Sequence, residues 1–318
     1  MDYKVIIVGA GPAGIFAAMT LADFGIKGIL LLEQGKDLSK RERQNPEDRL
    51  CGWGGAGAFS DGKLTLSTEV GGVLKDFMEE GPLYELLKDT DGIYAANGAP
   101  DRIFGKSSPQ LEELADRARM ADLELLPNRI RHIGTDNCQA VLESFKKSLV
   151  GRVDIHTESE VKELIADHGS IQGVKLADGR SIPSNFVIVA PGRSGARWMK
   201  KQAESLGLTT RATSVDIGVR VELSAPVLKE ITDTAYESKL IHYSKTFDDK
   251  VRTFCMNPYG EVVTEANSGI VTVNGHSYAR KRSQNTNFAI LVSSAFTEPF
   301  DDPIAYGHYI ARLANLLG

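Results

Sequence analysis

The apolar positions at the start of the chain follow first a strand pattern and then a helical one. Residues 5–8 form an uninterrupted apolar, β-branched run that leads into the glycine-rich segment 9–14. Apolar residues then recur at helical spacing through residue 22, and a second apolar run, residues 28–32, ends in Glu33. This order predicts a strand, a tight turn, a helix and a second strand.

The same periodicities predict further elements along the chain. Before residue 131 the pattern is helical with breaks, and a helix near residues 73–78 is expected to end at Gly81-Pro82 before another follows. Ser108-Pro109 predicts a third helix with serine as its N-cap. Later helices are expected over residues 136–149, 196–206 and 302–317, and strands over 153–157, 160–166, 171–176, 181–182, 186–190, 215–223, 251–256, 262–265, 270–273 and 288–293.

The order of elements predicts an α/β fold in three parts. A Rossmann-like dinucleotide-binding domain, with a parallel sheet and a β-meander, is expected from residues 1–64 and 131–207. Residues 65–130 form a helical insertion in this interpretation. Residues 208–318 are expected to form a second, mixed α+β domain that faces the substrate, because their sequence pattern predicts many strands.

The first turn carries a dinucleotide-binding pattern. Gly9 permits the tight turn, Gly11 lets the backbone approach a pyrophosphate, and Gly14 lets the helix pack closely on the strand. Glu33 follows Gly14 by about 20 residues, the spacing at which an acidic side chain accepts hydrogen bonds from an adenosine ribose. Because a carboxylate repels a 2′-phosphate, FAD or NAD is expected rather than NADP. The alternative is a glycine-rich turn without a ligand.

A second glycine-rich segment, residues 52–62, follows a strongly polar connection. Residues 36–49 of that connection are expected to be exposed. No apolar strand precedes the second segment, so a second Rossmann turn is not predicted. Its backbone N–H groups suit an anion or a flat ring lying against the main chain. A flexible loop is the alternative, although Trp53 and Phe59 favour an anchored one.

Composition limits the classes of partner. The chain has 318 residues, of which 42% are hydrophobic and 25% charged, and its net charge of −5 gives no reason to expect nucleic acid or an anionic membrane. The uncharged run 5–22 is interrupted by glycine and proline, so it is not expected to span a membrane. The three cysteines, Cys51, Cys138 and Cys255, form no C-x-x-C pair, which favours a reducing cytoplasm over a disulfide framework.

Candidate catalytic side chains are few. Cys255 is either a redox or nucleophilic thiol or, with apolar neighbours in a predicted strand, an inert core cysteine. His276 and Tyr278 are candidates for an acid or base within a polar cluster around Gly275, for which a polar β-turn is the alternative. The six histidines are scattered without metal-ligand spacing, so no metal is assigned.

Several motifs together resemble those of known flavoproteins. The later apolar strand ends in Ala190-Pro191-Gly192, as in FAD-binding proteins of the glutathione-reductase superfamily. More closely, residues 54–64 and 252–263, with the distinctive run Ser60 to Lys63, resemble a poorly characterised family of microbial FAD-dependent dehydrogenases over essentially the whole chain.

The resemblance implies which residues hold the cofactor. The first glycines would bind the pyrophosphate, Glu33 the ribose and the backbone at Val161 the adenine, while residues 54–63 would lie along the ribityl chain and isoalloxazine. Lys63 would then stabilise charge on reduced flavin, with a solvated turn residue as the alternative. The candidate cofactor-binding residues are Gly9, Gly11, Pro12, Ala13, Gly14, Glu33, Gln34, Gly54, Gly55, Ala56, Gly57, Ser60, Asp61, Gly62, Lys63, Val161, Ala190, Pro191 and Gly192.

These observations predict an FAD-dependent oxidoreductase acting on an unidentified small molecule, with NAD(P)H as a possible transient electron donor and Lys63, Cys255 and His276 as candidate catalytic residues. Members of the family continue into another glycine-rich flavin motif, which does not follow residue 318, so a fragment or short form is expected. The alternatives are a non-catalytic or partner-completed FAD- or NAD-binding protein and a single-domain NAD-dependent dehydrogenase.

Overall fold

The computed structural model describes residues 3–45, 48–126, 128–211, 213–267, 269–294 and 302–317. Its chain forms two compact units, each built from two separate segments. Unit 1 comprises Met1–Phe59 and Cys138–Arg211, and unit 2 comprises Ser60–Asn137 and Ala212–Gly318. No helix in the described part of the chain combines the length and apolarity needed to cross a membrane.

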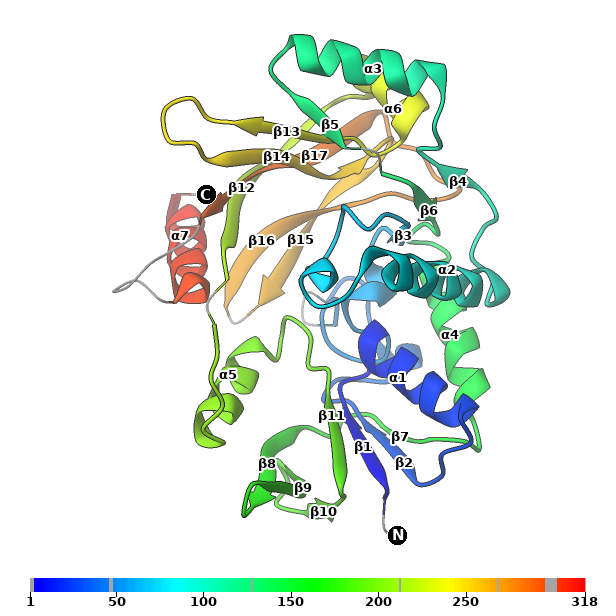
Figure 1. Ribbon diagram of the computed structural model, residues 1–318, viewed down its shortest axis with the longest axis vertical. Helices are drawn as coiled ribbons and strands as arrows, with labels where there is room; N and C mark the ends of the chain where they lie inside the picture. The colour runs from blue at the N-terminus through cyan, green and yellow to red at the C-terminus, as the bar shows by residue number, and fades with distance from the viewer. Residues whose placement is uncertain are drawn as a thin grey trace. The chain divides into compact units, whose positions relative to one another are not determined.

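Unit 1 contains a parallel sheet in the order β11-β1-β2-β7, as predicted for a Rossmann-like domain (Figure 1). An antiparallel meander, β10-β9-β8, accompanies it. Its strands are β1 (Val5–Val8), β2 (Ile29–Leu32), β7 (Asp154–His156), β8 (Val161–Asp167), β9 (Ser170–Leu176), β10 (Ser181–Pro183) and β11 (Phe186–Val189). Its helices are α1 (Pro12–Asp23), η1 (Leu38–Lys40), η2 (Gly55–Phe59), α4 (Cys138–Leu149) and α5 (Ala196–Ser205).

The core of unit 1 lies between the parallel sheet and the meander. Ile6 and Leu30, from neighbouring strands of the sheet, are completely buried and pack with Val174 and Leu176 of the meander. Helix α1 lies against α4, where the rings of Phe16 and Phe145 meet edge to face with centroids 5.7 Å apart. Burial of β1 and β2 along their whole length explains why both read as continuous apolar runs.

Unit 2 is built on a five-stranded antiparallel sheet in the order β12-β17-β14-β13-β5. Two small sheets, β15-β16 and β3-β6-β4, complete it. Its strands are β3 (Lys63–Thr65), β4 (Ile103–Phe104), β5 (Glu124–Leu126), β6 (Ile130–His132), β12 (Val215–Ser224), β13 (Lys239–Tyr243), β14 (Lys250–Asn257), β15 (Glu261–Asn267), β16 (Ile270–His276) and β17 (Asn285–Ser294). Its helices are η3 (Leu74–Asp76), α2 (Glu80–Ala96), α3 (Pro109–Met120), η4 (Ala225–Leu228), α6 (Lys229–Ala235) and α7 (Pro303–Leu317).

The two units divide the chain differently from the expected three parts. The structure places Ser60 to Lys63 in unit 2 and groups residues 65–130 with the β-rich residues instead of leaving them as a separate helical insertion. The reason is strand pairing: β5 joins the large sheet through β13, and β6 pairs with both β3 and β4. Strands of two or three residues are too short to show an alternating pattern in the sequence.

Of the two predictions about helix ends before residue 131, one is confirmed and the other is wrong. Ser108 caps α3 as predicted, because its hydroxyl accepts a hydrogen bond from the N–H of Leu111 at 3.2 Å and Pro109 follows at the first helical position. The expectation that Gly81-Pro82 ends a helix is wrong, since both residues lie in the first turn of α2. Proline is accepted there because the first N–H groups of a helix have no intrahelical partner.

Candidate functional site

The first βα turn of unit 1 depends on glycine at two of its positions for different contacts. Gly9 has φ +101°, and a Cβ atom there would lie 2.2 Å from the carbonyl oxygen of Ala190. At Gly14 a Cβ atom would lie 1.9 Å from the carbonyl oxygen of Gly9. A Cβ atom on Gly11, in contrast, would meet no atom within 4 Å. Gly9 and Gly14 are therefore required by packing, whereas Gly11 borders open space.

That space belongs to a cavity of about 510 Å³ in unit 1. Five segments line it, and each of them contains predicted cofactor-binding residues. These residues are Gly9, Gly11 and Pro12 of the first turn, Glu33 and Gln34 after β2, Gly55, Ala56 and Gly57 of η2, Val161 of β8, and Ala190, Pro191 and Gly192 after β11. Tertiary structure thus brings together segments that are up to about 180 residues apart in the chain.

The remaining predicted cofactor residues do not line this cavity. Ala13 is exposed on α1 and Gly14 is buried behind the turn. Gly54 lies against α4, since a Cβ atom there would be 2.3 Å from a methyl group of Leu142. Residues 60–63 belong to unit 2.

Glu33 is buried and its carboxylate accepts three backbone hydrogen bonds. The donors are the N–H groups of Ala10 and Gly35, both at 2.8 Å, and that of Gly52 at 3.0 Å. The carboxylate therefore joins the first turn to the second glycine-rich segment. A carboxylate offers about four lone-pair positions, so one is left for a ligand hydroxyl. The ribose contact expected for Glu33 stays a prediction.

The second glycine-rich segment is anchored, as Trp53 and Phe59 indicated. The indole of Trp53 is completely buried and its Nε1 donates to the carbonyl oxygen of Leu142 at 3.1 Å. Gly54 N–H donates to the carbonyl oxygen of Ala10 at 2.8 Å. The segment then enters the short helix η2, which ends at the buried Phe59. It is therefore a fixed part of the cavity wall.

The expectation that residues 36–49 form an exposed connection is wrong at three positions. Leu38, Arg41 and Asp48 are all buried. Arg41 is a functional candidate that the sequence did not reveal, because a basic residue among many charged ones carries no local sign of burial. The signal appears only in three dimensions, where backbone carbonyl groups surround its guanidinium.

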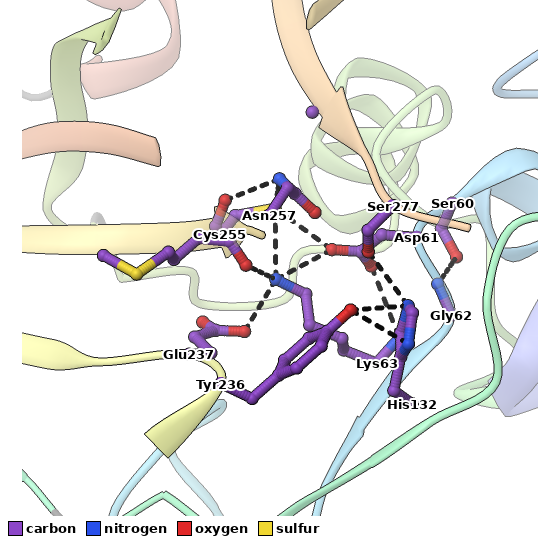
Figure 2. Close-up of polar contacts among 12 residues, drawn as sticks. Ser60, Asp61, Gly62, Lys63, His132, Tyr236, Glu237, Cys255, Asn257 and Ser277 are labelled. Carbon is purple, nitrogen blue, oxygen red and sulfur yellow. Dashed lines mark hydrogen bonds and ion pairs between the residues drawn. The ribbon is translucent and has the colours of Figure 1, made fainter. Parts of the chain in front are cut away.

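Unit 2 holds a polar cluster centred on Lys63 (Figure 2). Its ammonium group lies 2.9 Å from Asp61 and 2.7 Å from Glu237, and it donates to the carbonyl oxygen of Met256 at 2.7 Å. Only 6% of the side chain is exposed, so it is not a solvated turn residue. Burial disfavours the charged form, but the two carboxylates outweigh it and hold the pKa of Lys63 well above its usual value. All three ammonium protons therefore have acceptors.

Cys255 lies beside this ammonium group. Its thiol donates to Asp61 at 3.3 Å, and its sulfur is 3.9 Å from the Nζ of Lys63. The residue has φ +48° at an irregularity where β14 pairs with β17, a geometry that redirects a side chain. Burial raises the pKa of the Cys255 thiol. The thiol therefore has polar neighbours, unlike an inert core cysteine, yet it is held in the protonated form.

A second part of the cluster consists of His132, Tyr236 and Ser277 (Figure 2). The Ser277 hydroxyl lies 2.9 Å from Nε2 of His132, and the Tyr236 hydroxyl lies 2.9 Å from Nδ1. Burial lowers the pKa of His132 to about 4 and raises the pKa of Tyr236 to about 12, so both are neutral near pH 7. Tyr236, with φ 58° and ψ −65°, occupies the centre of a strained γ-turn closed by a 2.7 Å hydrogen bond between its neighbours.

Asn274, Gly275 and His276 lie in a strand, and Tyr278 follows it. The alternative of a polar β-turn is wrong, because residues 270–276 form β16. His276 is 2% exposed, and the hydroxyl of Tyr278 donates to Glu261 at 3.1 Å. Among the described residues, no group of three or more His, Cys, Asp or Glu side chains is arranged to hold a metal ion.

Comparison with protein families adds two matches at opposite ends of the chain. Residues 2–51, which include the first turn and Glu33, match a family described as an FAD binding domain. Residues 214–313 match a family described as the C-terminal domain of FAD-dependent proteins. The first match includes the part of the cavity wall formed by the first turn and by Glu33 and Gln34.

Two relatives are similar over parts of their length. An uncharacterized protein of Clostridium beijerinckii is 29% identical over 315 residues, which cover 91% of this chain and 51% of that protein. A tRNA uridine 5-carboxymethylaminomethyl modification enzyme of Treponema denticola is 27% identical over 195 residues, covering 60% of this chain and 26% of that enzyme. The chain thus spans about half the length of the first relative and about a quarter of the second.

Solved structures similar to the chain include two amino acid oxidases. NikD, from nikkomycin biosynthesis, is 15% identical with a TM-score of 0.47, and the alignment covers 96% of this chain and 72% of NikD. Glycine oxidase of Bacillus cereus is 14% identical with a TM-score of 0.42, covering 94% of this chain and 77% of the oxidase. Both family matches are to domains of FAD-binding or FAD-dependent proteins, and they indicate FAD as the cofactor of this chain.

Proposed function

We propose that the protein is an FAD-dependent oxidoreductase that moves hydride or electrons through a non-covalently bound flavin to or from a small molecule. The observation that carries the proposal is the cavity of unit 1, where the first glycine turn, Glu33, η2 and the segment after β11 meet. When FAD is bound, its isoalloxazine supplies the hydride and electron chemistry, while the protein binds and orients it.

The first turn fits the pyrophosphate of FAD. Gly11 is the N-cap residue of α1, and the space beyond its Cα is open. The first N–H groups of a helix have no intrahelical acceptor and lie at the positive end of its dipole, which favours a phosphate. No acidic side chain occupies the first turn of α1 to compete with it. The residues present therefore suit a dinucleotide.

Glu33 and Val161, which also line the cavity, suit the adenosine part. Glu33 retains one lone-pair position, which can accept a ribose hydroxyl, and Val161 supplies the backbone that the flavoprotein resemblance assigns to the adenine. A carboxylate at this position disfavours a 2′-phosphate. Reduced nicotinamide nucleotides are the proposed transient electron donors.

The absorption spectrum of the purified protein provides the first test. A yellow protein that releases FAD on denaturation supports the proposal, and bleaching by NADH or NADPH without oxygen demonstrates hydride acceptance. Full binding of FAD that dithionite reduces but no nicotinamide or substrate candidate reduces would indicate a binding protein rather than an oxidoreductase. Protein that neither retains FAD nor rebinds it refutes the cofactor assignment.

Gly11→Val tests the placement of the cofactor within the cavity. The Cβ of the new side chain would meet no protein atom within 4 Å and would enter the space beside the turn, so FAD affinity should fall while the fold persists. Gly92→Val is the matched control, because a Cβ atom at Gly92 of α2 also meets no atom within 4 Å. FAD binding by Gly11→Val equal to that of the control would show that the pyrophosphate does not lie there.

A further inference from the structure

We propose that Arg41 is a positioning residue for FAD, which shapes the cavity wall formed by residues 52–57 although it does not line the cavity itself. The proposal rests on FAD binding by unit 1. It assigns a function to the polar connection between Glu33 and the second glycine-rich segment.

The guanidinium of Arg41 ties two turns of unit 1 together. It donates to the carbonyl oxygen of Asp48 at 2.9 Å, to that of Gly55 at 2.8 Å and to that of Trp53. One face of the guanidinium lies over the ring of Phe59, with 5.0 Å between the guanidinium carbon and the ring centroid. Arg41 is only 6% exposed, so these contacts replace water.

The turn that carries Arg41 is itself fixed. The carboxylate of Asp48 accepts a hydrogen bond from the N–H of Glu42 at 2.8 Å and forms an ion pair with Lys36 at 3.1 Å. Glu33 holds the following segment through the N–H of Gly52. Hydrogen bonds and an ion pair therefore hold the turn that carries Arg41, and other hydrogen bonds hold the segment that its guanidinium contacts.

The contact with Gly55 sets the direction of the next amide group. A trans peptide is planar, with its C=O and N–H pointing in opposite directions. Because the carbonyl group of Gly55 points at Arg41, the N–H of Ala56 points away from it. Gly55, Ala56 and Gly57 line the cavity, so this amide is a preformed donor for an anionic or carbonyl group of the cofactor.

The charge and shape of arginine are both needed in this position. Burial lowers the pKa of Arg41 to about 10, against the opposing effect of Glu33 and Asp48, so the side chain remains charged near pH 7. A guanidinium presents five donors in a planar fork, whereas an ammonium group presents its three donors from a single nitrogen and cannot match the positions of the carbonyl groups of Asp48, Trp53 and Gly55. The substitution Arg41→Lys should therefore keep the positive charge but change the shape of the cavity wall formed by residues 52–57.

The first experiment compares FAD affinity in Arg41→Lys with that in Arg180→Lys, whose arginine lies in unit 1 with 66% of its side chain exposed. FAD is titrated into cofactor-free protein and its fluorescence is followed. Arg41→Lys should bind FAD roughly 10- to 100-fold more weakly than wild type, since hydrogen bonds to a charged group are lost. Arg180→Lys should bind as wild type does.

The second experiment measures hydrogen exchange of backbone amides in the same proteins without FAD. In wild type, the amides of residues 52–55 and of Gly57, which have acceptors within unit 1, should exchange slowly compared with the exposed segment around Gly71 and Gly72. In Arg41→Lys the faster exchange should be confined to residues 48–57, while α1 and β1 keep their protection. A general loss of rigidity would instead raise exchange throughout unit 1.

The outcomes separate this proposal from the proposed function. Wild-type protein that does not bind FAD overturns the function. Wild-type protein that binds FAD, together with an Arg41→Lys variant that binds it within twofold, overturns the role of Arg41. The role is also overturned if the amides of residues 52–55 and of Gly57 in cofactor-free wild type exchange as fast as the segment around Gly71, a result that requires no variant to fold.

Discussion

His132 makes the stability of the protein depend on pH. Its imidazole is buried between the hydroxyl groups of Tyr236 and Ser277. Burial disfavours the imidazolium and lowers the pKa of His132 to about 4 from 6.5, with Lys63 adding to this effect and Asp61 opposing it. The unfolded chain therefore binds a proton between pH 6.5 and 4 that the folded protein does not bind.

The sign and size of the effect follow from this difference in proton binding. Above about pH 6.5 the neutral imidazole does not lower the free energy of unfolding. As the pH falls below this value, the free energy of unfolding decreases, because the unfolded chain binds the proton more tightly than the folded protein does. Lowering of this pKa from 6.5 to about 4 corresponds to about 3 kcal/mol when both states are protonated, and to about 2 kcal/mol at pH 5. This is a large share of the free energy of unfolding of an ordinary domain.

The assay is urea unfolding followed by far-UV circular dichroism at pH 8 and pH 5. His132→Asn cannot take up a proton, so wild type should lose about 2 kcal/mol more than this variant between the two pH values. Comparison with the variant removes the contribution of carboxylates common to both proteins. His168→Asn, whose imidazole is 95% exposed, controls for the loss of a histidine as such. Equal losses in wild type and His132→Asn would refute the reasoning.

Two further substitutions test the ion pairs of unit 2 and the first turn of unit 1. Lys63→Met should lower the free energy of unfolding by about 3–5 kcal/mol, because the carboxylates of Asp61 and Glu237 would stay buried without their cation. Urea unfolding measures this loss, which should shrink at low pH as the carboxylates take up protons. Gly14→Ala should cost more than about 4 kcal/mol, since its methyl group would strike the carbonyl oxygen of Gly9, and the yield of folded protein and its melting temperature report this.

Matched exposed positions supply the controls for both substitutions. The side chain of Lys88 is 67% exposed, so Lys88→Met should change the stability by less than about 0.5 kcal/mol. Gly92→Ala lies within α2 in open space and should be neutral or slightly stabilising. A Lys63→Met protein as stable as Lys88→Met would contradict the buried ion pairs. Tolerance of alanine at Gly14 would contradict the close packing of α1 on the turn.

The nucleotide-binding part of the fold could be predicted from the sequence because its signals are local. A short apolar run, glycines at fixed spacing and a terminal acidic residue describe β1, α1 and β2 within about 30 residues. The meander, β11 and α5 were predicted for the same reason, since each has its own periodicity and turn residues. Each of the five segments that line the cavity accordingly contains predicted residues, whereas other lining residues, among them Arg193, Arg197 and Trp198, were not predicted.

Errors arose where a residue type is compatible with two environments. Proline at position 82 is unfavourable inside a helix but acceptable in a first turn, and only the structure shows that α2 begins there. Arg41 belongs to a charged stretch that suggests solvent, yet carbonyl groups some seven to fourteen positions away satisfy its guanidinium. A sequence pattern records the charge of such a residue but not the partners that permit its burial.

The sequence alone determined the dinucleotide turn and the alternation of strands and helices, because backbone conformation and apolar periodicity act over a few residues. Tertiary structure decided the rest: the three backbone donors on Glu33, the burial of Arg41, and the assembly of Lys63, His132, Tyr236 and Cys255 into one polar cluster. Those groups are far apart in the chain, and their protonation depends on burial and neighbouring charge. Such properties exist only once the chain has folded.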